Sequence, residues 1–211
     1  QQRFVSDVSH ELRTPLTTIR MASDVIYAAR EGFDPTIARS AELLLSQIDR
    51  FEELLTDLLE VSRFDAQVAT LSLSRIDITK LVNRCVEDLA MDAKQRDVKI
   101  RIDAPQEELL IDGDLRRIER IMRNLLANAI DHAEGTPVDL TIKDSQSAVS
   151  IAVRDYGVGI ATHHLERVFD RFWRADPSRS RIRGGTGLGL SIAREDANLH
   201  GGDIKLWSEL G

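Results

Sequence analysis

The sequence predicts two domains in succession, an all-α domain followed by an α/β domain. Over the first third of the 211 residues, apolar side chains recur at alternating steps of three and four, the spacing of helices that pack side by side. After Asp65 the pattern changes to short alternating runs between helical segments, which is typical of strands in an α/β domain. We therefore expect a helical domain over residues 1–66 and a mixed α/β domain over residues 70–211.

Two heptad series predict a helical hairpin. The first series comprises Val5, Val8, Leu12, Pro15, Ile19, Ala22 and Ile26. The second comprises Ile37, Ala41, Leu44, Ile48, Phe51, Leu55 and Leu58. Residues 31–35, Glu-Gly-Phe-Asp-Pro, indicate a helix stop and restart between them. Further apolar residues widen the second stripe beyond what one partner helix covers, namely Leu45, Leu54 and Leu59. We therefore expect a dimeric four-helix bundle, with packing onto the rest of the same chain as the alternative.

The second domain is expected to be an α/β sandwich, with helices on one side of a mixed sheet. Asp77 is a suitable N-cap for its first helix. The expected strands cover residues 71–76, 98–102, 109–111, 138–143, 149–154 and 204–207, with 138–143 and 149–154 as a hairpin. The expected helices cover residues 78–94, 115–133 and 188–199.

Composition excludes several classes of protein. The hydrophobic share of 42% and charged share of 30% are ordinary for a globular chain and argue against disorder. The formal charge of −7 makes a general nucleic-acid binder a poor interpretation. Cys85 is the single cysteine, so no intrachain disulfide can form. No apolar stretch has the length of a membrane helix, and the first residues enter a helical pattern without a signal peptide, so we expect a fragment of a longer protein.

His10 is a candidate for an exposed nucleophile, although most lone histidines on a protein surface have no catalytic role. It occupies a heptad position that faces solvent, and Glu11 beside it can take a proton from imidazole. Thr14 lies one turn further along. Pro15 sits inside the helix, where a proline costs about 3 kcal/mol, and this indicates a deliberate kink near His10.

Asn124 and Asn128 share a face of the helix expected over residues 115–133. A solvated surface would explain them, since asparagine is often tolerated outside. The functional interpretation is a ligand face, in which an amide oxygen coordinates a hard cation such as Mg²⁺.

Two glycine-rich segments are suited to ligand binding. Asp155 follows a strand and precedes Gly157 and Gly159, whose spacing allows a flat ligand to approach the backbone. Residues 184–190, Gly-Gly-Thr-Gly-Leu-Gly-Leu, open a helix and present free N–H groups to phosphate. They lack the lysine of a Walker A loop. The preceding basic loop contains Arg171, Arg174, Arg179, Arg181 and Arg183. An ordinary turn and a loop of solvated arginines are the plainer interpretations.

Taken in order, these segments resemble the catalytic core of bacterial two-component sensor histidine kinases over nearly all 211 residues. The segments that carry the resemblance are residues 10–16 (H box), 124–129 (N box), 155–159 (first glycine box), 169–172 (F box) and 187–190 (second glycine box). Residues 128–134 and 172–179 resemble the actinobacterial branch of this family in particular. The resemblance implies that the second domain has the ATP-binding fold shared with gyrase, Hsp90 and MutL.

The resemblance also implies roles. His10 would be the phosphoacceptor, Glu11 its general base, and Thr14 the residue that positions water when the phosphorylated partner is dephosphorylated. Asn128 would bind Mg²⁺ with Asn124 supporting it. The residues implied to bind ATP are Asn124, Asn128, His132, Asp155, Gly157, Gly159, Arg171, Arg174, Thr186, Gly187, Leu188 and Gly189, with Asp155 reading the adenine amine. The implied partners are a second copy of the chain and a response regulator, and no nucleic acid. The full-length protein would lie on the cytoplasmic side of the membrane, anchored by a segment outside this chain.

Three departures from the family pattern qualify these roles. The family often has lysine at Asp131, so we expect a lid arginine to replace its contact with phosphate. It often has asparagine at Tyr156. It usually continues past Gly211 into one more strand, so we expect that strand to be missing and one sheet edge to be uncovered.

Two rival functions come from other classes. A non-catalytic ATP-sensing scaffold, or pseudokinase, is opposed by the intact His10, Asn128, Asp155 and Gly187. An ATPase that transfers phosphate to water is opposed by the helical hairpin with its exposed His-Glu pair.

Overall fold

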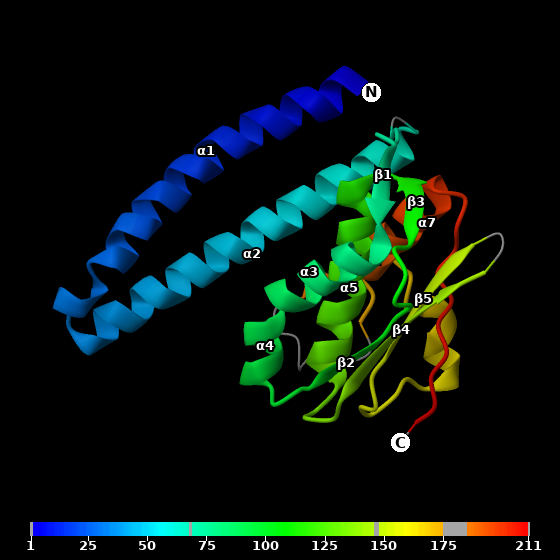
Figure 1. Cartoon of the computed structure of the whole chain (residues 1–211). Helices are drawn as coiled ribbons and strands as arrows, with labels where there is room; N and C mark the ends of the chain where they lie inside the picture. Colours follow the sequence, from blue (N-terminus) through cyan, green and yellow to red (C-terminus); the bar gives the residue numbers. More distant parts are fainter. Residues whose placement is uncertain (1, 68, 146–147, 175–184, 211) are drawn as a thin grey trace. The chain divides into compact units, whose positions relative to one another are not determined.

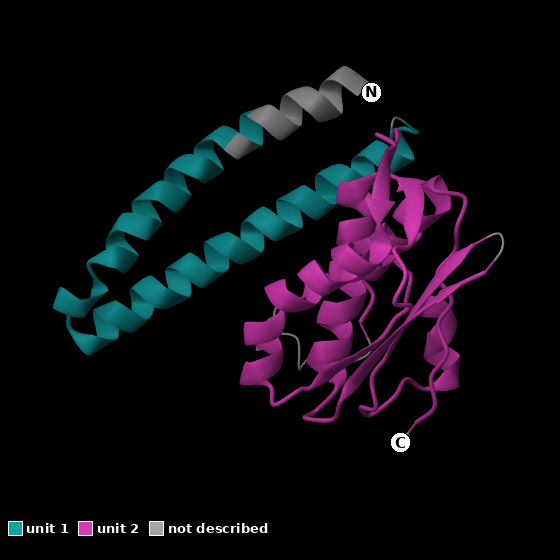
Figure 2. Cartoon of the chain, viewed as in Figure 1, with its two compact units in different colours: residues 1–69 teal, residues 70–211 magenta. Residues whose placement is uncertain are grey.

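The structure is a computed structural model that describes residues 2–67, 69–145, 148–174 and 185–210. Within these ranges, side chains are described from Glu11 onward, apart from Arg13. The chain divides into two compact units between Ala69 and Thr70, which Figure 2 colours separately.

The first unit is the expected helical hairpin (Figure 1). Helix α1 spans Gln2–Ala28 and contains Pro15, and helix α2 spans Pro35–Asp65. A short 3-10 turn, η1 (Arg30–Gly32), joins them. The restart follows from local chemistry, because Asp34 is the N-cap and its Oδ1 accepts a hydrogen bond from Thr36 N at 2.9 Å.

The two helices pack through a narrow line of small and apolar side chains. Leu16 and Ser23 of α1 are buried, as are Ala41 and Ile48 of α2. Arg20 adds charged contacts between the helices. Its Nη1 lies 2.8 Å from Asp49 Oδ1 and also contacts Glu52 Oε2.

A second line of large apolar side chains stays exposed on the same hairpin. Its members are seven residues apart on each helix: Leu12, Ile19 and Ile26 on α1, and Ile37, Leu44, Phe51 and Leu58 on α2. Their exposed fractions lie between 40% and 56%. Most of the predicted heptad residues are therefore not where the hairpin packs on itself. Only Ala41 and Ile48 of the second series are buried among the described side chains, since one face of each helix suffices for the hairpin contact.

The second unit contains two small sheets (Figure 1). Strands β1 (Ser74–Asp77) and β3 (Leu110–Gly113) form an antiparallel pair. In the other sheet, β4 (Val138–Asp144) lies between two partners. It runs parallel to β2 (Ile100–Asp103) and antiparallel to β5 (Val149–Arg154). The expected mixed sheet and its β4–β5 hairpin are confirmed.

The described helices of the second unit are α3 (Ile78–Asp88), α4 (Ala90–Gln95), α5 (Leu115–His132) and α7 (Gly189–Leu199), with a 3-10 turn, η2, over Thr162–Arg167. Helices α3 and α5 pack against the mixed sheet, and α7 packs on α5. The single helix expected over residues 78–94 is interrupted at Leu89, whose ψ of 4° departs from helical geometry. Leu89 and Ala93 are both buried, so the bend keeps apolar side chains on each side of it in the core.

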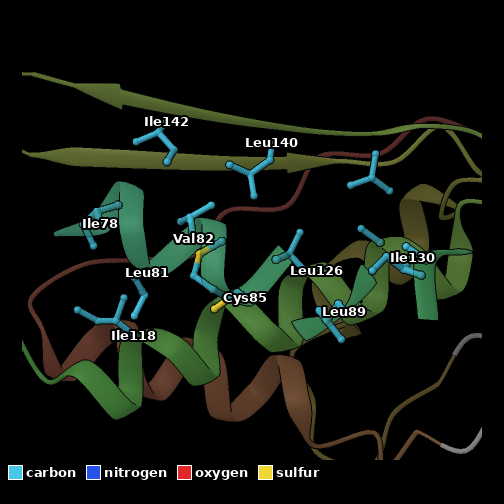
Figure 3. Close-up of a cluster of buried hydrophobic side chains, with 14 of the residues drawn as sticks. Ile78, Leu81, Val82, Cys85, Leu89, Ile118, Leu126, Ile130, Leu140 and Ile142 are labelled. Atoms are coloured by element: carbon cyan, nitrogen blue, oxygen red, sulfur yellow. The ribbon is translucent and has the colours of Figure 1, made fainter. Parts of the chain in front are cut away.

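The core lies between strand β4 and helices α3 and α5 (Figure 3). Alternate residues of β4 are fully or almost fully buried, namely Val138, Leu140 and Ile142. Helix α3 contributes Ile78, Leu81, Val82 and Cys85, and helix α5 contributes Ile118, Met122, Leu126 and Ile130. Burial raises the pKa of the Cys85 thiol. This core fixes the rotation of α5 about its axis and therefore decides which α5 residues face away from the sheet.

The last expected strand does not form. Residues 203–210 have no regular secondary structure. The contacts described for this segment come from two side chains and from the Glu209 backbone, which lies close to Gly159. The Ser208 hydroxyl accepts a hydrogen bond from Ile160 N at 2.8 Å, and the Trp207 ring lies 5.6 Å from the Arg154 guanidinium. In the described part of the chain, no helix is long and apolar enough to cross a membrane.

Candidate functional site

Helix α5 carries Asn124 and Asn128 on the face that points away from the core. Asn124 Nδ2 donates a hydrogen bond to the carbonyl oxygen of Gly189 at 3.0 Å. A Cβ atom on Gly189 would lie 3.1 Å from Asn124 Oδ1, which is closer than most side-chain carbons approach. The helix that begins at Gly189 is therefore held against the middle of α5, and this contact joins two of the predicted motifs.

A buried ion cluster fixes α7 against α5. Asp196 of α7 is 0% exposed. Its carboxylate receives Arg117 Nη1 at 2.7 Å and, from Arg120, Nε at 2.7 Å and Nη2 at 2.8 Å. Arg–carboxylate contacts of this kind are geometrically specific as well as strong. The cluster therefore sets the position of α7 and of the glycine loop at its start.

The loop after β5 reaches the other end of α5. Asp155 Oδ1 accepts a hydrogen bond from Gly157 N at 3.0 Å, which tightens the turn. A Cβ atom on Gly157 would lie 1.9 Å from the carbonyl oxygen of His132, the last residue of α5. Gly159 has a φ of +69°, and a Cβ there would lie 1.9 Å from the Glu209 carbonyl oxygen. Both positions therefore require glycine.

Tyr156 ties this loop to the sheet. Its hydroxyl donates a hydrogen bond to Asp139 Oδ2 of β4 at 2.8 Å, and the Arg154 guanidinium lies 4.6 Å from its ring. The hydrogen bond to Asp139 raises the pKa of the Tyr156 phenol. A tyrosine in place of the family's usual asparagine thus anchors the turn that carries Asp155.

Phe172 and Arg174 contact the second glycine-rich segment. Phe172 adopts a φ of 62°, and its N–H bonds to the Gly187 carbonyl oxygen at 2.9 Å. Gly187 has a φ of +73°, and a Cβ there would lie 3.0 Å from Phe172 Cα. Arg174 Nη1 contacts the Gly185 carbonyl oxygen. The Thr186 hydroxyl accepts a hydrogen bond from Leu188 N at 3.1 Å.

A cavity of about 540 Å³ lies along this segment. It is lined by His164, Arg167, Asp170, Arg171, Phe172, Trp173 and Arg174. The lining is basic and aromatic, so the cavity suits an anionic group beside a flat or apolar one. Arg171 and Arg174, both predicted site residues, are among its walls.

Asp131 and His132 are the last two residues of α5. His132 is exposed, and its backbone carbonyl, rather than its ring, makes the close approach to Gly157. Asp131 Oδ1 lies 2.7 Å from Arg96 Nη2 at the end of α4. Of the lid arginines, one of which was expected to compensate for Asp131, Arg171 and Arg174 are described, whereas Arg179, Arg181 and Arg183 lie outside the described residues.

The proposed phosphoacceptor region is described in part. His10 lies in α1, but its side chain is outside the described residues. Glu11, Thr14, Thr17 and Met21 are exposed along the same helix, Met21 at 65%.

The residues of the second unit fit a magnesium ion held with a nucleotide. Mg²⁺ usually takes one or two protein oxygens and completes its shell with phosphate oxygens and water. Asn128 is half-buried on the α5 face of Asn124 and offers one amide oxygen. Within the described ranges, no group of three or more His, Cys, Asp or Glu side chains could hold a metal alone.

Sequence reasoning missed the charged residues that hold the site together, namely Arg96, Arg117, Arg120 and Asp196. For Asp196, the sequence does contain one signal of a buried role. Asp196 interrupts the apolar positions Ile192, Ala193 and Ala197 of α7, and a carboxylate within an apolar face indicates a buried partner.

Comparison with known proteins agrees with this geometry. Residues 1–67 match the family described as "His Kinase A (phospho-acceptor) domain". Residues 113–211 match "Histidine kinase-, DNA gyrase B-, and HSP90-like ATPase", a family of ATP-binding domains.

Sequence and structural relatives give the same result. The chain is 52% identical to the sensor histidine kinase MtrB of Mycobacterium tuberculosis (strain H37Rv) over 100% of its length and 37% of that protein. It is 40% identical to the histidine-protein kinase AfsQ2 of Streptomyces coelicolor, over 96% of this chain and 38% of that one. The chain thus spans less than two fifths of these relatives. The crystal structure of full-length ShkA in complex with AMPPNP superposes with a TM-score of 0.81 at 27% identity, covering 99% of this chain and 43% of ShkA.

The actinobacterial resemblance inferred from residues 128–134 and 172–179 is confirmed by the similarity to MtrB. With its phospho-acceptor domain followed by a gyrase- and Hsp90-like ATP-binding domain, the chain belongs to the sensor histidine kinases.

Proposed function

We propose that this chain autophosphorylates on His10 with ATP and Mg²⁺ and passes the phosphoryl group to an aspartate of a response regulator. One observation carries the proposal most directly. The hydrogen bond from Asn124 to Gly189 and the close approach of Gly157 to His132 bring the N box and both glycine motifs to one helix, α5. That convergence supports a nucleotide site built around the exposed face of α5.

In this site, the Asp155 carboxylate accepts a hydrogen bond from the adenine amine. Its Oδ1 already receives Gly157 N, so the orientation of the carboxylate is fixed by the turn. Gly157 and Gly159 let the base approach the backbone. Asn128 binds Mg²⁺, with Asn124 in support. His132 lies beside the base, and the phosphates meet Arg171, Arg174 and the backbone of Thr186, Gly187, Leu188 and Gly189.

The transfer step needs little from the protein beyond position and charge. A neutral ring nitrogen of His10 attacks the γ-phosphorus of ATP, the bond to the β–γ bridging oxygen breaks, and ADP leaves. Glu11 takes the proton from the other ring nitrogen as the N–P bond forms. A Mg²⁺ ion held by Asn128 would neutralise charge on the departing phosphates.

The proposed partners follow from the first unit. A second copy covers the exposed heptad residues of the hairpin, and a response regulator meets α1 near His10. Thr14 positions water against the phosphorylated regulator, which gives the chain phosphatase activity. In the full-length protein, a membrane segment outside this chain holds these domains at the cytoplasmic side.

Incubation of the chain with γ-labelled ATP and Mg²⁺ tests this function. We expect label on the protein that is labile in acid and stable in base, as an N–P bond is. His10→Gln should remove the label and leave ATP affinity nearly unchanged, because His10 belongs to the first unit and the nucleotide residues to the second. Label persisting in His10→Gln would contradict the assignment. ATP binding without any label in the unchanged chain would favour a non-catalytic scaffold.

A further inference from the structure

The C-terminal end of α4 places a guanidinium on the face of α5 that carries the two asparagines. Asp131 follows Asn124 by seven residues and Asn128 by three, a spacing that puts the three side chains on one face of a helix. Arg96 Nη2 lies 2.7 Å from Asp131 Oδ1. Arg96 therefore reaches this face although it belongs to another helix.

The backbone holds Arg96 in place. Its N–H bonds to the carbonyl oxygens of Asp92 at 3.3 Å and Ala93 at 3.2 Å. The chain then turns sharply, because Asp97 adopts a φ of 56° and Val98 N bonds to Ala93 O at 2.9 Å. These backbone bonds fix the point from which the Arg96 side chain extends toward α5.

The pair is accessible to a ligand and retains donors for one. The side chains of Arg96 and Asp131 are 35% and 30% exposed. A guanidinium has five N–H donors in a planar fork and can bind a carboxylate and a phosphate together. Among the described residues, Arg96 makes one contact from Nη2 to Asp131 and one from Nη1 to the Asp92 carbonyl oxygen, at 3.4 Å.

Charge explains why the two residues occur together. A carboxylate at Asp131 without a partner would repel a triphosphate on this face of α5. When it pairs with Arg96, the Asp131 carboxylate instead orients the positively charged guanidinium toward this face of α5.

We propose that Arg96 is a nucleotide-binding residue whose guanidinium donates hydrogen bonds to the phosphates of ATP. Asp131 is its positioning residue, since it acts through Arg96 and not on the ligand. The proposal rests on the nucleotide site proposed above and adds a phosphate contact from α4, an element that none of the sequence motifs includes.

Calorimetric titration of the 211-residue chain with ATP and Mg²⁺, and separately with adenosine, tests the role of Arg96. Arg96→Ala should weaken ATP binding at least about tenfold, the size expected for one charge-assisted hydrogen bond. Adenosine binding should not change, because adenosine has no phosphate. Asp131→Asn should give a smaller loss for ATP, since the guanidinium stays but is held less firmly.

Arg84→Ala is the matched control. Arg84 Nη2 of α3 lies 3.1 Å from Glu119 Oε2 of α5, so this variant also breaks an ion pair between α5 and a neighbouring helix. The Arg84–Glu119 pair lies on the side of α5 that meets α3, away from the two asparagines. The affinities for ATP and for adenosine should therefore stay as they are in the unchanged chain.

A rescue separates a ligand contact from a structural one. Asp131→Lys places an ammonium directly on the asparagine face, so ATP affinity should recover in Arg96→Ala/Asp131→Lys relative to Arg96→Ala. Wild-type ATP affinity in Arg96→Ala, or equal losses of ATP and adenosine affinity, would overturn the proposal while the nucleotide site stands. Absence of ATP binding in the unchanged chain would reject the site itself, and the role of Arg96 with it.

Discussion

Among single residues, Asp114 joins several segments at the start of α5. Its carboxylate accepts hydrogen bonds from Ser72 N at 2.9 Å, Arg116 N at 3.1 Å and Arg117 N at 3.2 Å. Burial opposes ionisation of Asp114, but these amide hydrogen bonds outweigh it and lower the pKa of the carboxyl group. One side chain therefore caps the helix that carries the nucleotide residues and ties it to the segment before β1.

The lowered pKa of Asp114 predicts a dependence of stability on pH. A carboxyl group with a lower pKa in the folded state stabilises that state above the unfolded pKa of about 4. This contribution is lost as the pH falls through the lower, folded pKa. Asp114→Ala should cost about 1 kcal/mol of unfolding free energy at pH 7, as a lost helix cap does. Urea unfolding of the unchanged chain and of Asp114→Ala between pH 7 and pH 3 measures both effects. The difference in unfolding free energy between the two proteins should become smaller as the pH falls.

Thr14 is the residue at which kinase and phosphatase activities should separate. Its hydroxyl lies one turn from His10 on the exposed side of α1 and can orient water toward an aspartyl phosphate. The proposed attack of imidazole on ATP assigns no role to this hydroxyl. Thr14→Ala should therefore keep autophosphorylation and lower phosphatase activity, measured as release of phosphate from the labelled regulator. Equal loss of both activities would mean that Thr14 supports the helix near Pro15.

At the scale of elements, the contact between α5 and α7 depends on Asp196. Asp196→Ala would leave Arg117 and Arg120 without this carboxylate in a largely buried place, and breaking a buried pair costs about 3 kcal/mol or more. Because α7 positions the glycine loop, ATP affinity should fall together with the unfolding free energy in urea. The neighbouring Glu195 is exposed, so Glu195→Ala serves as the control and should change neither.

The second prediction at this scale concerns a stripe of side chains on α1 that begins at His10. Thr14, Thr17 and Met21 follow His10 at four, seven and eleven residues, which places all four on one line along the helix. Methionine suits adaptable contacts with a partner. Met21→Asp should slow phosphotransfer at limiting regulator and leave autophosphorylation unchanged.

Met91→Asp is the control for Met21→Asp. Met91 is exposed to nearly the same extent, at 66%, but lies on α4 of the second unit. This variant should leave phosphotransfer as it is. Unchanged transfer in Met21→Asp would remove the stripe as the regulator's docking face.

For the whole molecule, the exposed heptad line predicts assembly. Leu12, Ile19 and Ile26 on α1 continue as Ile37, Leu44, Phe51 and Leu58 on α2, all at least 40% exposed. A line of this length on one chain is typical of a surface that a second helical hairpin covers. Leu44→Glu/Phe51→Glu should therefore convert a dimer into a monomer in sedimentation equilibrium. Leu73→Glu, at a position 64% exposed in the second unit, should leave the dimer intact. A monomeric unchanged chain would contradict the four-helix bundle.

The sequence by itself determined the order of the elements and the family. The break at residues 31–35, the helix after Asp114 and the hairpin of β4 and β5 all follow from local signals, such as caps, turn residues and the period of apolar side chains. The resemblance that these motifs carry in their order implied that Asn124, Asp155 and Gly187 belong to one site.

Only the tertiary structure decided which residues meet. Asp196 and its two arginines are 76 and 79 residues apart in the chain, and Arg96 and Asp131 are also remote in sequence. No local pattern encodes such pairs, because they depend on how α4, α5 and α7 pack. The strand expected at residues 204–207 is wrong for a related reason. Alternating apolar residues permit a strand, but a strand forms only where a neighbour supplies a backbone ladder. The described contacts of this segment are instead the hydrogen bond to Ser208, the ring contact of Trp207 and the close approach of the Glu209 backbone to Gly159.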